Sequence, residues 1–403
     1  MSIMEEIIFT LFKIKDYKLK SIKRDKSIIL ELERSSPRYC RECGKECRIY
    51  DSSYQTFYLG SLNSEPVYAV VKVARVKCVD HGVKTEFHGI TNGKRRYTQA
   101  VADTVIQYTQ LLDNESTAKL LGISKSTVYR IDTEVLSNAF LKYQKSIPSA
   151  EHLCVDETSY QRGHKYATII SDYKTGKVLW VEKDRKESSL SHCYQAINSI
   201  LKGVKAVSMD LWKAFENATK IYIPKALIVY DKFHLSRILN RYVEEQRRSY
   251  QHYLSDKERL HIKKHTRWVL LKRQRNHSLS DSMDLEKLKM ANETLFELYL
   301  LKESFLEIFD YSDTSRKQAA EEIRAWIKEV NKTDFECLKR FAKATEKRLH
   351  KMLNWFDCPI SNGKAEGVNN SIKTLFKRAY GYKDFDYMKL KILQKNGYLM
   401  KYV

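Results

Sequence analysis

The sequence predicts a mixed α/β protein whose β-sheet domain is interrupted by an all-helical segment and preceded by two small modules. Its 403 residues include 13 Gly and 5 Pro, which favours a helix-rich chain with few long loops. Short apolar strand patterns follow one another between residues 152 and 230. A long polar stretch comes next, in which apolar residues recur at helical spacing. A hydrophobic content of 43% is enough for folded cores and excludes a wholly disordered chain.

The charge balance indicates a polyanionic partner. The chain has 72 Lys and Arg against 50 Asp and Glu, a net charge of +22. Such an excess adds nothing to the stability of a fold, and it is typical of proteins that bind nucleic acid or an anionic membrane surface. The sequence has no run of roughly 18 apolar residues, no cleavable signal and no basic amphipathic helix near a terminus. We therefore expect an intracellular, cytoplasmic protein with reduced thiols and no membrane partner.

Residues 1–95 contain four of the eight cysteines and predict a zinc-binding module. A C-x-x-C and a C-x-x-H knuckle, separated by a strand-like segment, supply the candidate ligands Cys40, Cys43, Cys78 and His81. Three thiolates and one imidazole suit a closed, structural, tetrahedral Zn²⁺ site. This pattern predicts a zinc-ribbon-like module. Cys47 is either a spare thiol or a substitute ligand, and ordinary unligated thiols are the alternative for the whole set.

Residues 96–147 contain a helix-turn-helix pattern. Ala118 and Leu121 belong to a short helix, Gly122 provides a tight turn, and Ser124 caps the next helix. The outward face of that second helix would carry the candidate DNA contacts Lys125, Ser126, Thr127 and Arg130. A helical hairpin without a DNA role is the alternative. Pro148 marks the boundary to the next domain.

Residues 148–235 have the pattern of three strands, then helix, strand, helix and strand, which is the order of a ribonuclease-H-like sheet. Asp156 lies on the first strand and Asp210 at the end of the fourth, and we expect these strands to be neighbours. Two adjacent carboxylates are costly unless a cation neutralises them. Oxygen ligands suit Mg²⁺ or Mn²⁺, and two such ions can support phosphodiester transfer. Glu157 should face away from Asp156 by strand alternation.

Residues 236–360 predict an all-α insertion, and its beginning is basic. Residues 241–275 carry 11 Lys and Arg against 4 Asp and Glu. Such a run is often a solvated face, and the alternative is a phosphate-binding surface. Within it we expect DNA contacts from Lys263, Lys264, Arg267, Lys272 and Arg273.

Residues 361–403 begin with a predicted amphipathic helix. One face carries polar residues at helical spacing, namely Glu366, Asn369, Asn370, Lys373 and Lys377, and the opposite face is apolar. This face would place a metal ligand beside phosphate-binding groups, and Arg378 next to Lys377 is a further DNA candidate. A solvated surface stripe is the alternative.

Several segments together carry a resemblance to a known family. The segments CVDETSY, VSMDLWKAF and IPKALIVYDKFHL, with the C-terminal block EGVNNSIKTLFKRAYGY, resemble bacterial DDE transposases of the ISL-three (ISL3) insertion-sequence family. The resemblance implies a Mg²⁺-dependent acid triad, which falls on Asp156, Asp210 and Glu366. The Asp231-x-x-His234 element resembles a signature of related transposases, and Asp231 competes with Asp210 for the role of second acid.

The same resemblance implies further features of the site. Asp231, His234, Asn370 and Lys373 become supporting residues of the active site. The family's second knuckle usually ends in Cys, where this chain has His81.

The family resemblance also implies a function. The protein would bind the terminal inverted repeats of its element, cleave the DNA, and join the 3′-hydroxyl ends to target DNA. Two transposon ends favour a homodimer on double-stranded DNA, in association with the bacterial nucleoid. Two alternatives remain, a DNA-binding regulator with an inactive sheet domain and a nuclease that cuts without joining.

Overall fold

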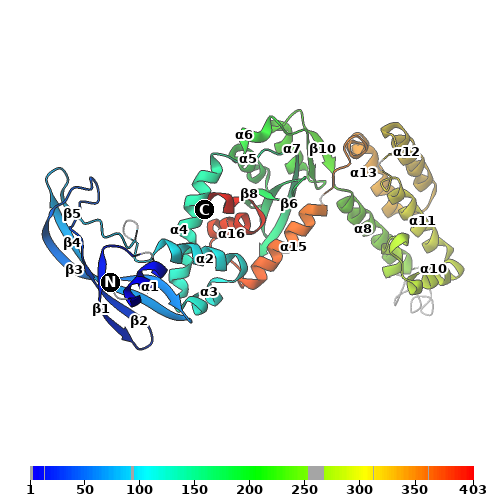
Figure 1. The fold of residues 1–403 in the computed structure, drawn as a ribbon. Coiled ribbons are helices and arrows are strands. Elements are labelled where there is room, and N and C mark those ends of the chain that lie inside the picture. The colour runs from blue at the N-terminus through cyan, green and yellow to red at the C-terminus, as the bar shows by residue number, and fades with distance from the viewer. Residues whose placement is uncertain (1–2, 13, 92–94, 253–266, 312, 362) are drawn as a thin grey trace. The chain divides into compact units, whose positions relative to one another are not determined.

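The computed structural model describes residues 3–403 except 13, 92–94, 253–266, 312 and 362 (Figure 1). The chain divides into two compact units. The first unit consists of Met1–Tyr143, Leu375–Lys395 and Leu399–Val403. The second unit consists of Gln144–Thr374 and Asn396–Tyr398. None of the described helices combines the length and the apolar character that crossing a bilayer requires.

The first unit begins with a helix and a sheet. The elements are α1 (Ile3–Phe12), β1 (Tyr17–Arg24), β2 (Ile28–Arg34), β3 (Arg48–Leu62), β4 (Glu65–Cys78) and β5 (Gly82–Thr85). The strand order is β1-β2-β4-β3, with β5 paired to β4. The β2–β4 pair is parallel and the others are antiparallel. Alternate apolar residues of β2, β3 and β4 form a core with Phe9 of α1, because successive strand residues point to opposite faces.

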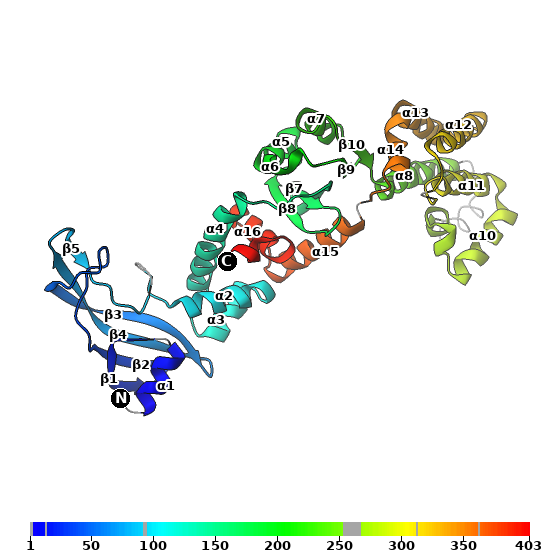
Figure 2. The same ribbon diagram turned by 45° about the horizontal axis from the view of Figure 1, so that its top comes forward.

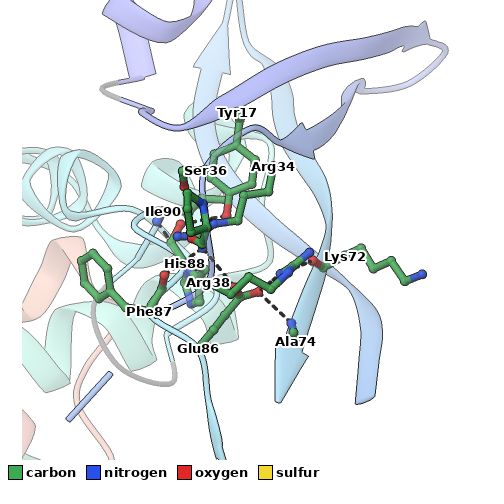
Figure 3. Close-up of polar contacts among 11 residues, drawn as sticks. Tyr17, Arg34, Ser36, Arg38, Lys72, Ala74, Glu86, Phe87, His88 and Ile90 are labelled. Atoms are coloured by element: carbon green, nitrogen blue, oxygen red, sulfur yellow. Dashed lines mark hydrogen bonds and ion pairs between the residues drawn. The ribbon is translucent and has the colours of Figure 1, made fainter. Parts of the chain in front are cut away.

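A buried carboxylate joins three segments of this sheet, as Figure 3 shows. Glu86, which is 2% exposed, accepts hydrogen bonds from Arg34 at 3.1 Å, from Arg38, and from the backbone N–H of Ala74 at 2.7 Å. A buried charge is tolerated when its counter-charges and hydrogen bonds are complete, and here two guanidinium groups serve one carboxylate. The chain before the first cysteine knuckle and the chain after the second are thereby fixed to β4.

Three helices follow in the first unit, α2 (Gln99–Leu111), α3 (Asn114–Leu121) and α4 (Lys125–Gln144). Asp113 caps α3, and Gly122 ends it with a φ of 66°, in the left-handed region. A Cβ at Gly122 would lie 2.9 Å from the Cδ of Pro66, so the turn requires glycine for conformation and for space. The apolar residues of these helices share one core with Tyr58 of β3.

The C-terminal elements α16 (Phe385–Asn396) and η2 (Leu399–Tyr402) complete the first unit. Asp132 of α4 is fully buried and accepts hydrogen bonds from Thr109 at 2.6 Å, Tyr387 at 2.6 Å and Lys391 at 2.9 Å. The last two donors belong to α16. A buried ion pair therefore fixes the C-terminal helix to the helices of residues 99–144.

The second unit contains a mixed sheet. Its strands are β6 (His152–Gln161), β7 (Lys165–Asp172), β8 (Val178–Lys183), β9 (Ala206–Met209) and β10 (Leu227–Tyr230). The order is β10-β9-β6-β7-β8, with β6 parallel to β9 and β9 parallel to β10. Helices α5 (Glu187–Ala196), α6 (Asn198–Leu201) and α7 (Lys213–Tyr222) connect the later strands. The expected neighbourhood of the first and fourth strands is confirmed.

The remaining described elements of the second unit are helices, the last of which extends into the first unit (Figure 2). They are α8 (Lys232–Gln251), η1 (Gln274–Asn276), α10 (Leu279–Ala291), α11 (Glu293–Glu307), α12 (Arg316–Lys332), α13 (Glu336–Met352) and α14 (Asn354–Asp357), followed by α15 (Gly363–Arg378). The described parts of residues 236–360 contain no strand. Aromatic packing of Phe305, Trp326 and Phe341 forms their core. Lys351 of α13 pairs with Glu216 of α7, which links these helices to the sheet layer.

Candidate active site

Acidic side chains meet where the parallel strands of the second unit end. Asp156 lies within β6, Asp210 directly follows β9, and Asp231 directly follows β10. These strands are adjacent and parallel, so the carboxyl ends of β9 and β10 meet at the same edge of the sheet. His234 in the first turn of α8 and Glu366 in α15 line the same pocket, which encloses about 220 Å³.

The two carboxylate oxygens of Asp210 differ in their contacts with the described residues. Its Oδ2 accepts a hydrogen bond from Nδ1 of His234 at 2.8 Å. Its Oδ1 is buried and has no hydrogen-bond partner among the described residues. Asp156, Asp210 and His234 each offer an atom within 4.8 Å of the others. An orphaned, buried carboxylate oxygen beside a second carboxylate fits a divalent cation, because oxygen ligands are those that Mg²⁺ and Mn²⁺ prefer.

Asp156 has a fixed hydrogen-bond partner at each oxygen. Its Oδ1 accepts the backbone N–H of Glu157 at 2.7 Å, and its Oδ2 accepts Nδ2 of Asn369 at 2.6 Å. Asn369 belongs to α15 and is 8% exposed. Its position on the polar face of the predicted helix, three residues after Glu366, was visible in the sequence. The sequence did not reveal that it would contact Asp156.

Burial and neighbouring charge alter the protonation of this site. Burial raises the pKa of Asp156 to about 7, and the negative charge of Asp210 adds to the shift. Burial lowers the pKa of His234, but its hydrogen bond to Asp210 and the charge of Asp210 outweigh that effect, so the pKa is raised overall. A site with these properties holds a proton near neutral pH, and a cation that binds to Asp156 would displace it.

The remaining predicted residues of the site have different positions. Glu366 lies in the first turn of α15 and lines the pocket, together with Asn370 and Lys373, but it is not in the cluster of ligand atoms within 4.8 Å. Asp231 also lines the pocket and is almost fully buried. Glu157, which strand alternation predicts to face away from Asp156, also lines the pocket, but it forms an ion pair with Arg185 at 3.0 Å and is not in the cluster.

The four predicted zinc ligands come together in the first unit. One ligand atom from each of Cys40, Cys43, Cys78 and His81 lies within 4.8 Å of the others. The sulfur atoms of Cys43 and Cys78 are 3.6 Å apart, and the Cys78 sulfur is 3.7 Å from Nδ1 of His81. The hydrogen bond with His81 lowers the pKa of Cys78 to about 6, which favours the thiolate that a metal requires. Cys47 is outside this cluster, and its thiol donates to the carbonyl of Lys45.

The predicted DNA contacts of α4 lie in its first two turns. Lys125 is exposed and 3.6 Å from a carboxylate oxygen of Glu115. The hydroxyls of Ser126 and Thr127 each lie 2.9 Å from the Ser124 hydroxyl. The guanidinium of Arg130 lies over a neighbouring tyrosine ring.

The predicted DNA contacts of the helical region differ in whether carboxylates of the protein already pair with them. Lys263 and Lys264 lie outside the described residues. Arg267 is half exposed and 3.4 Å from Glu244. Lys272 pairs with Asp281 at 2.5 Å, and the largely buried Arg273 pairs with two carboxylates, those of Glu303 and Asp310. The charges of Lys272 and Arg273 are therefore already compensated within the protein.

The last pair of predicted DNA contacts ends α15. Lys377 is exposed in the last turn of this helix. Arg378 donates hydrogen bonds to the carbonyls of Gln110 and Leu111 at the end of α2. These bonds use carbonyl groups that lack partners within their own helix.

Known proteins resemble this chain over most of its length. Residues 153–392 match a family of ISL3 type that is described as transposase. The transposase for insertion sequence element IS1001 of Bordetella parapertussis is 27% identical over 358 residues, which are 88% of this chain and 87% of that protein. The transposase for insertion sequence element IS1557 of Mycobacterium tuberculosis is 22% identical over 371 residues, 86% of this chain and 83% of that protein.

Among solved structures, the Drosophila P element transposase strand transfer complex matches 77% of this chain and 95% of its own chain, with 12% identity and a TM-score of 0.39. The family assignment depends on the sequence match, which spans more than half of the chain and includes the acidic residues of β6 and of the β9 and β10 ends. The chain belongs to the ISL3 family of DDE transposases.

Proposed function

We propose that the protein binds the terminal inverted repeats of its insertion sequence, cleaves them by Mg²⁺-dependent phosphodiester hydrolysis, and joins the 3′-hydroxyl ends to target DNA by transesterification. One observation carries this proposal. Asp156 and Asp210 meet on adjacent strands, and the buried Oδ1 of Asp210 has no hydrogen-bond partner among the described residues. A pair of acids in this state is suited to bind a divalent cation, and two-metal phosphodiester transfer uses such a pair.

The strand order supports a ribonuclease-H-like catalytic core. The order of strands and helices and the adjacency of the first and fourth strands agree with the sequence pattern, and the sheet has three antiparallel strands followed by two parallel ones. We assign residues 148–235 and the first part of the C-terminal segment, residues 361–374, to this core, and residues 236–360 to a helical insertion. The sequence predicts that all of residues 361–403 belong to the core, whereas α16 and η2 lie in the first unit. We assign residues 1–95 to a zinc-binding module and 96–147 to a helix-turn-helix domain.

Asp156, Asp210 and Glu366 would hold two Mg²⁺ or Mn²⁺ ions. When bound, these ions would activate the attacking water or hydroxyl and stabilise the leaving oxygen. His234 holds Asp210 through its Oδ2, which leaves Oδ1 for the metal. The Glu157 N–H and Asn369 fix the carboxylate plane of Asp156.

The other groups of the pocket would bind and orient the DNA. Lys373 and Asn370 lie on the α15 wall of the pocket, where they can contact the phosphate to be cut. The hydrogen bond to Asp210 raises the pKa of His234, which favours its positively charged form beside the phosphate. These groups need no movement of the sheet, because each is placed by a helix that begins at the pocket.

The first unit would supply DNA binding. Structural Zn²⁺ at Cys40, Cys43, Cys78 and His81 would hold the knuckles together, and the exposed start of α4 would enter the DNA. A homodimer would bring two transposon ends to one target, on the nucleoid in the cytoplasm. The net charge of +22 supports DNA as the partner.

The test uses isosteric variants of the acids. We expect Asp156→Asn, Asp210→Asn and Glu366→Gln to lose cleavage of a duplex that carries the element's ends, with DNA affinity retained, because each removes a metal ligand. Glu151→Gln, an exposed acid paired with Lys205, is the matched control and should cleave normally. Full cleavage by any of the three variants would remove that residue from the triad. A pre-cut end that is never joined to target DNA would identify a nuclease instead.

A further inference from the structure

A second cavity lies in the first unit, where β3 and β4 approach the turn between α3 and α4. It encloses about 410 Å³. Tyr58 and Tyr97 line it and are largely buried, and Tyr68 packs 5.5 Å from the Tyr58 ring. The hydroxyl of Tyr58 donates to the carbonyl of Leu121 at 2.7 Å, which fixes the strand to the end of α3. The cavity is therefore part of a shared core and not a gap between separate elements.

Arg96, which precedes α2, lines the cavity with a fixed guanidinium. This group lies 5.3 Å from the centre of the Phe57 ring and donates to the side-chain carbonyl of Gln55. Neither partner carries a negative charge. Arg96 forms no ion pair among the described residues, whereas the neighbouring Arg95 pairs with Glu134 at 2.8 Å. A guanidinium that is held in place without a counter-charge is prepared to bind phosphate oxygens.

Arg130 of α4 lines the same cavity and, like Arg96, lies over an aromatic ring. Its guanidinium lies 5.9 Å from the centre of the Tyr97 ring. Glu134, one turn further along the helix, accepts hydrogen bonds from Arg95 and Tyr97 instead. Arg130 forms no ion pair among the described residues, although its charge is one of those that lower the pKa of Glu134.

The hydroxyl groups of the turn add donors to the two arginines. Ser124 caps α4 by accepting the Thr127 N–H at 3.2 Å, and both residues line the cavity. The first-turn N–H groups of a helix lack partners within the helix and lie at its positive end. Two guanidinium groups, two hydroxyls and this helix end together favour a negatively charged ligand.

We propose that this cavity binds the sugar-phosphate backbone of duplex DNA, with Arg96 and Arg130 contacting phosphate oxygens. The proposal rests on the proposed function and extends its DNA contacts from α4 to β3 and to the segment before α2. The cavity exceeds the size of one phosphate, and its tyrosine wall suits the adjoining sugar. A backbone contact at this place would fix the depth and orientation of α4 in the DNA without reading sequence.

The test measures the salt dependence of binding to a labelled duplex of arbitrary sequence, by fluorescence anisotropy without Mg²⁺. Each lost phosphate contact lowers the slope of log K against log salt by about 0.9. We expect Arg96→Gln to lower the slope by that amount and the double variant Arg96→Gln/Arg130→Gln by about twice as much. At about 0.1 M salt, one lost contact corresponds to roughly eight-fold weaker binding.

Two further variants separate the cavity from net charge. Arg75→Gln removes one charge from β4 of the same sheet, but Arg75 already pairs with Asp51, so the slope should not change. Thr56→Trp fills the cavity without changing charge and should weaken binding. If Arg96→Gln and Arg75→Gln have equal effects and the wild type binds DNA, the cavity does not bind the DNA backbone, and the proposed function is unaffected. Wild-type protein that binds no duplex at all would overturn both.

Discussion

At the scale of single residues, the candidate site depends on how two carboxylates are partnered. Asp156 has a donor at each oxygen, whereas Asp210 has His234 at one oxygen and none among the described residues at the other. Burial makes a second negative charge at this place costly, and the raised pKa of Asp156 expresses that cost. The metal-free site is thus kept from full ionisation by its own geometry.

The pKa of Asp156 predicts how the stability of the metal-free protein changes with pH. The folded-state pKa of about 7 exceeds that of an unfolded aspartate, so its contribution to stability is present below about pH 4 and is lost as pH rises through about 7. Asp210 and Asp231 raise this pKa, and His234 and the Glu157 N–H lower it. The loss amounts to roughly 4 kcal/mol at most.

We expect Asp156→Asn to escape this loss, because asparagine does not titrate. Urea unfolding without added Mg²⁺ or Mn²⁺ checks it. The free energy of unfolding of the variant, relative to that of the wild type, should be larger at about pH 8 than at about pH 5. Added Mg²⁺ near pH 8 should stabilise the wild type and not the variant. A stability difference that is the same at both pH values would contradict the assigned protonation.

At the scale of elements, α15 organises the site. Glu366, Asn369, Asn370 and Lys373 occur at spacings of three and four, which places them on one helical face, and all four line the acidic pocket. In Figure 1, α15 runs beside β6, the strand that carries Asp156. The helix therefore supplies a candidate ligand and the donor that orients another ligand.

Asn369 is predicted to act as a positioning residue. Asn369→Ala removes the donor at Oδ2 of Asp156, and loss of such an outer partner typically costs roughly 10–100-fold in metal affinity or activity. We expect cleavage to require more Mg²⁺ and direct Mn²⁺ binding to weaken by a similar factor. We expect Asn369→Asp to impair cleavage more than Asn369→Ala, because it adds a carboxylate beside Asp156.

Thr374→Ala, in an exposed position one turn further along α15, is the control for this experiment. It should leave the metal dependence unchanged. An Asn369→Ala protein with wild-type Mn²⁺ affinity would show that the hydrogen bond has no part in metal binding.

At the scale of the whole molecule, the first unit joins the two ends of the chain. Residues from α16 and η2 pack with those of the first 143 positions, and the fully buried Asp132 is central to that contact. Its partner Lys391 also donates to the Thr109 carbonyl at 2.9 Å. The C-terminal segment is therefore needed to complete the core beneath the predicted recognition helix.

We predict that removing one partner of the Asp132–Lys391 pair lowers the free energy of unfolding strongly, and that replacing both partners lowers it little. Asp132→Ala leaves a buried ammonium without its counter-charge, which should lower the free energy of unfolding by about 3–5 kcal/mol. The double variant Asp132→Asn/Lys391→Met should regain most of this loss, because the charge is gone and Asn still accepts hydrogen bonds. Urea unfolding measures both. Arg24→Ala, which breaks an exposed pair with Glu65, should cost under about 1 kcal/mol. Equal costs for the two single variants would contradict the role of burial.

Much of this architecture could be predicted from the sequence. The order of strands and helices, the adjacency of the Asp156 and Asp210 strands, and the grouping of Cys40, Cys43, Cys78 and His81 followed from local patterns. Periodicity and ligand spacing are encoded within a few residues, so they can be read without knowing the fold. The family, too, was evident from motifs in the chain.

The pairings between distant residues were decided by the tertiary structure alone. Asn369 reaches Asp156 across 213 positions, and Lys391 reaches Asp132 across 259. Arg273, which the sequence offers as one more cation in a basic run, is neutralised by Glu303 and Asp310. Arg96 carries no such partner among the described residues and lines a cavity instead. Arg273 and Arg96 are the same residue type in the sequence. Only the packing of distant segments determines whether a carboxylate lies close enough to compensate the charge of such an arginine.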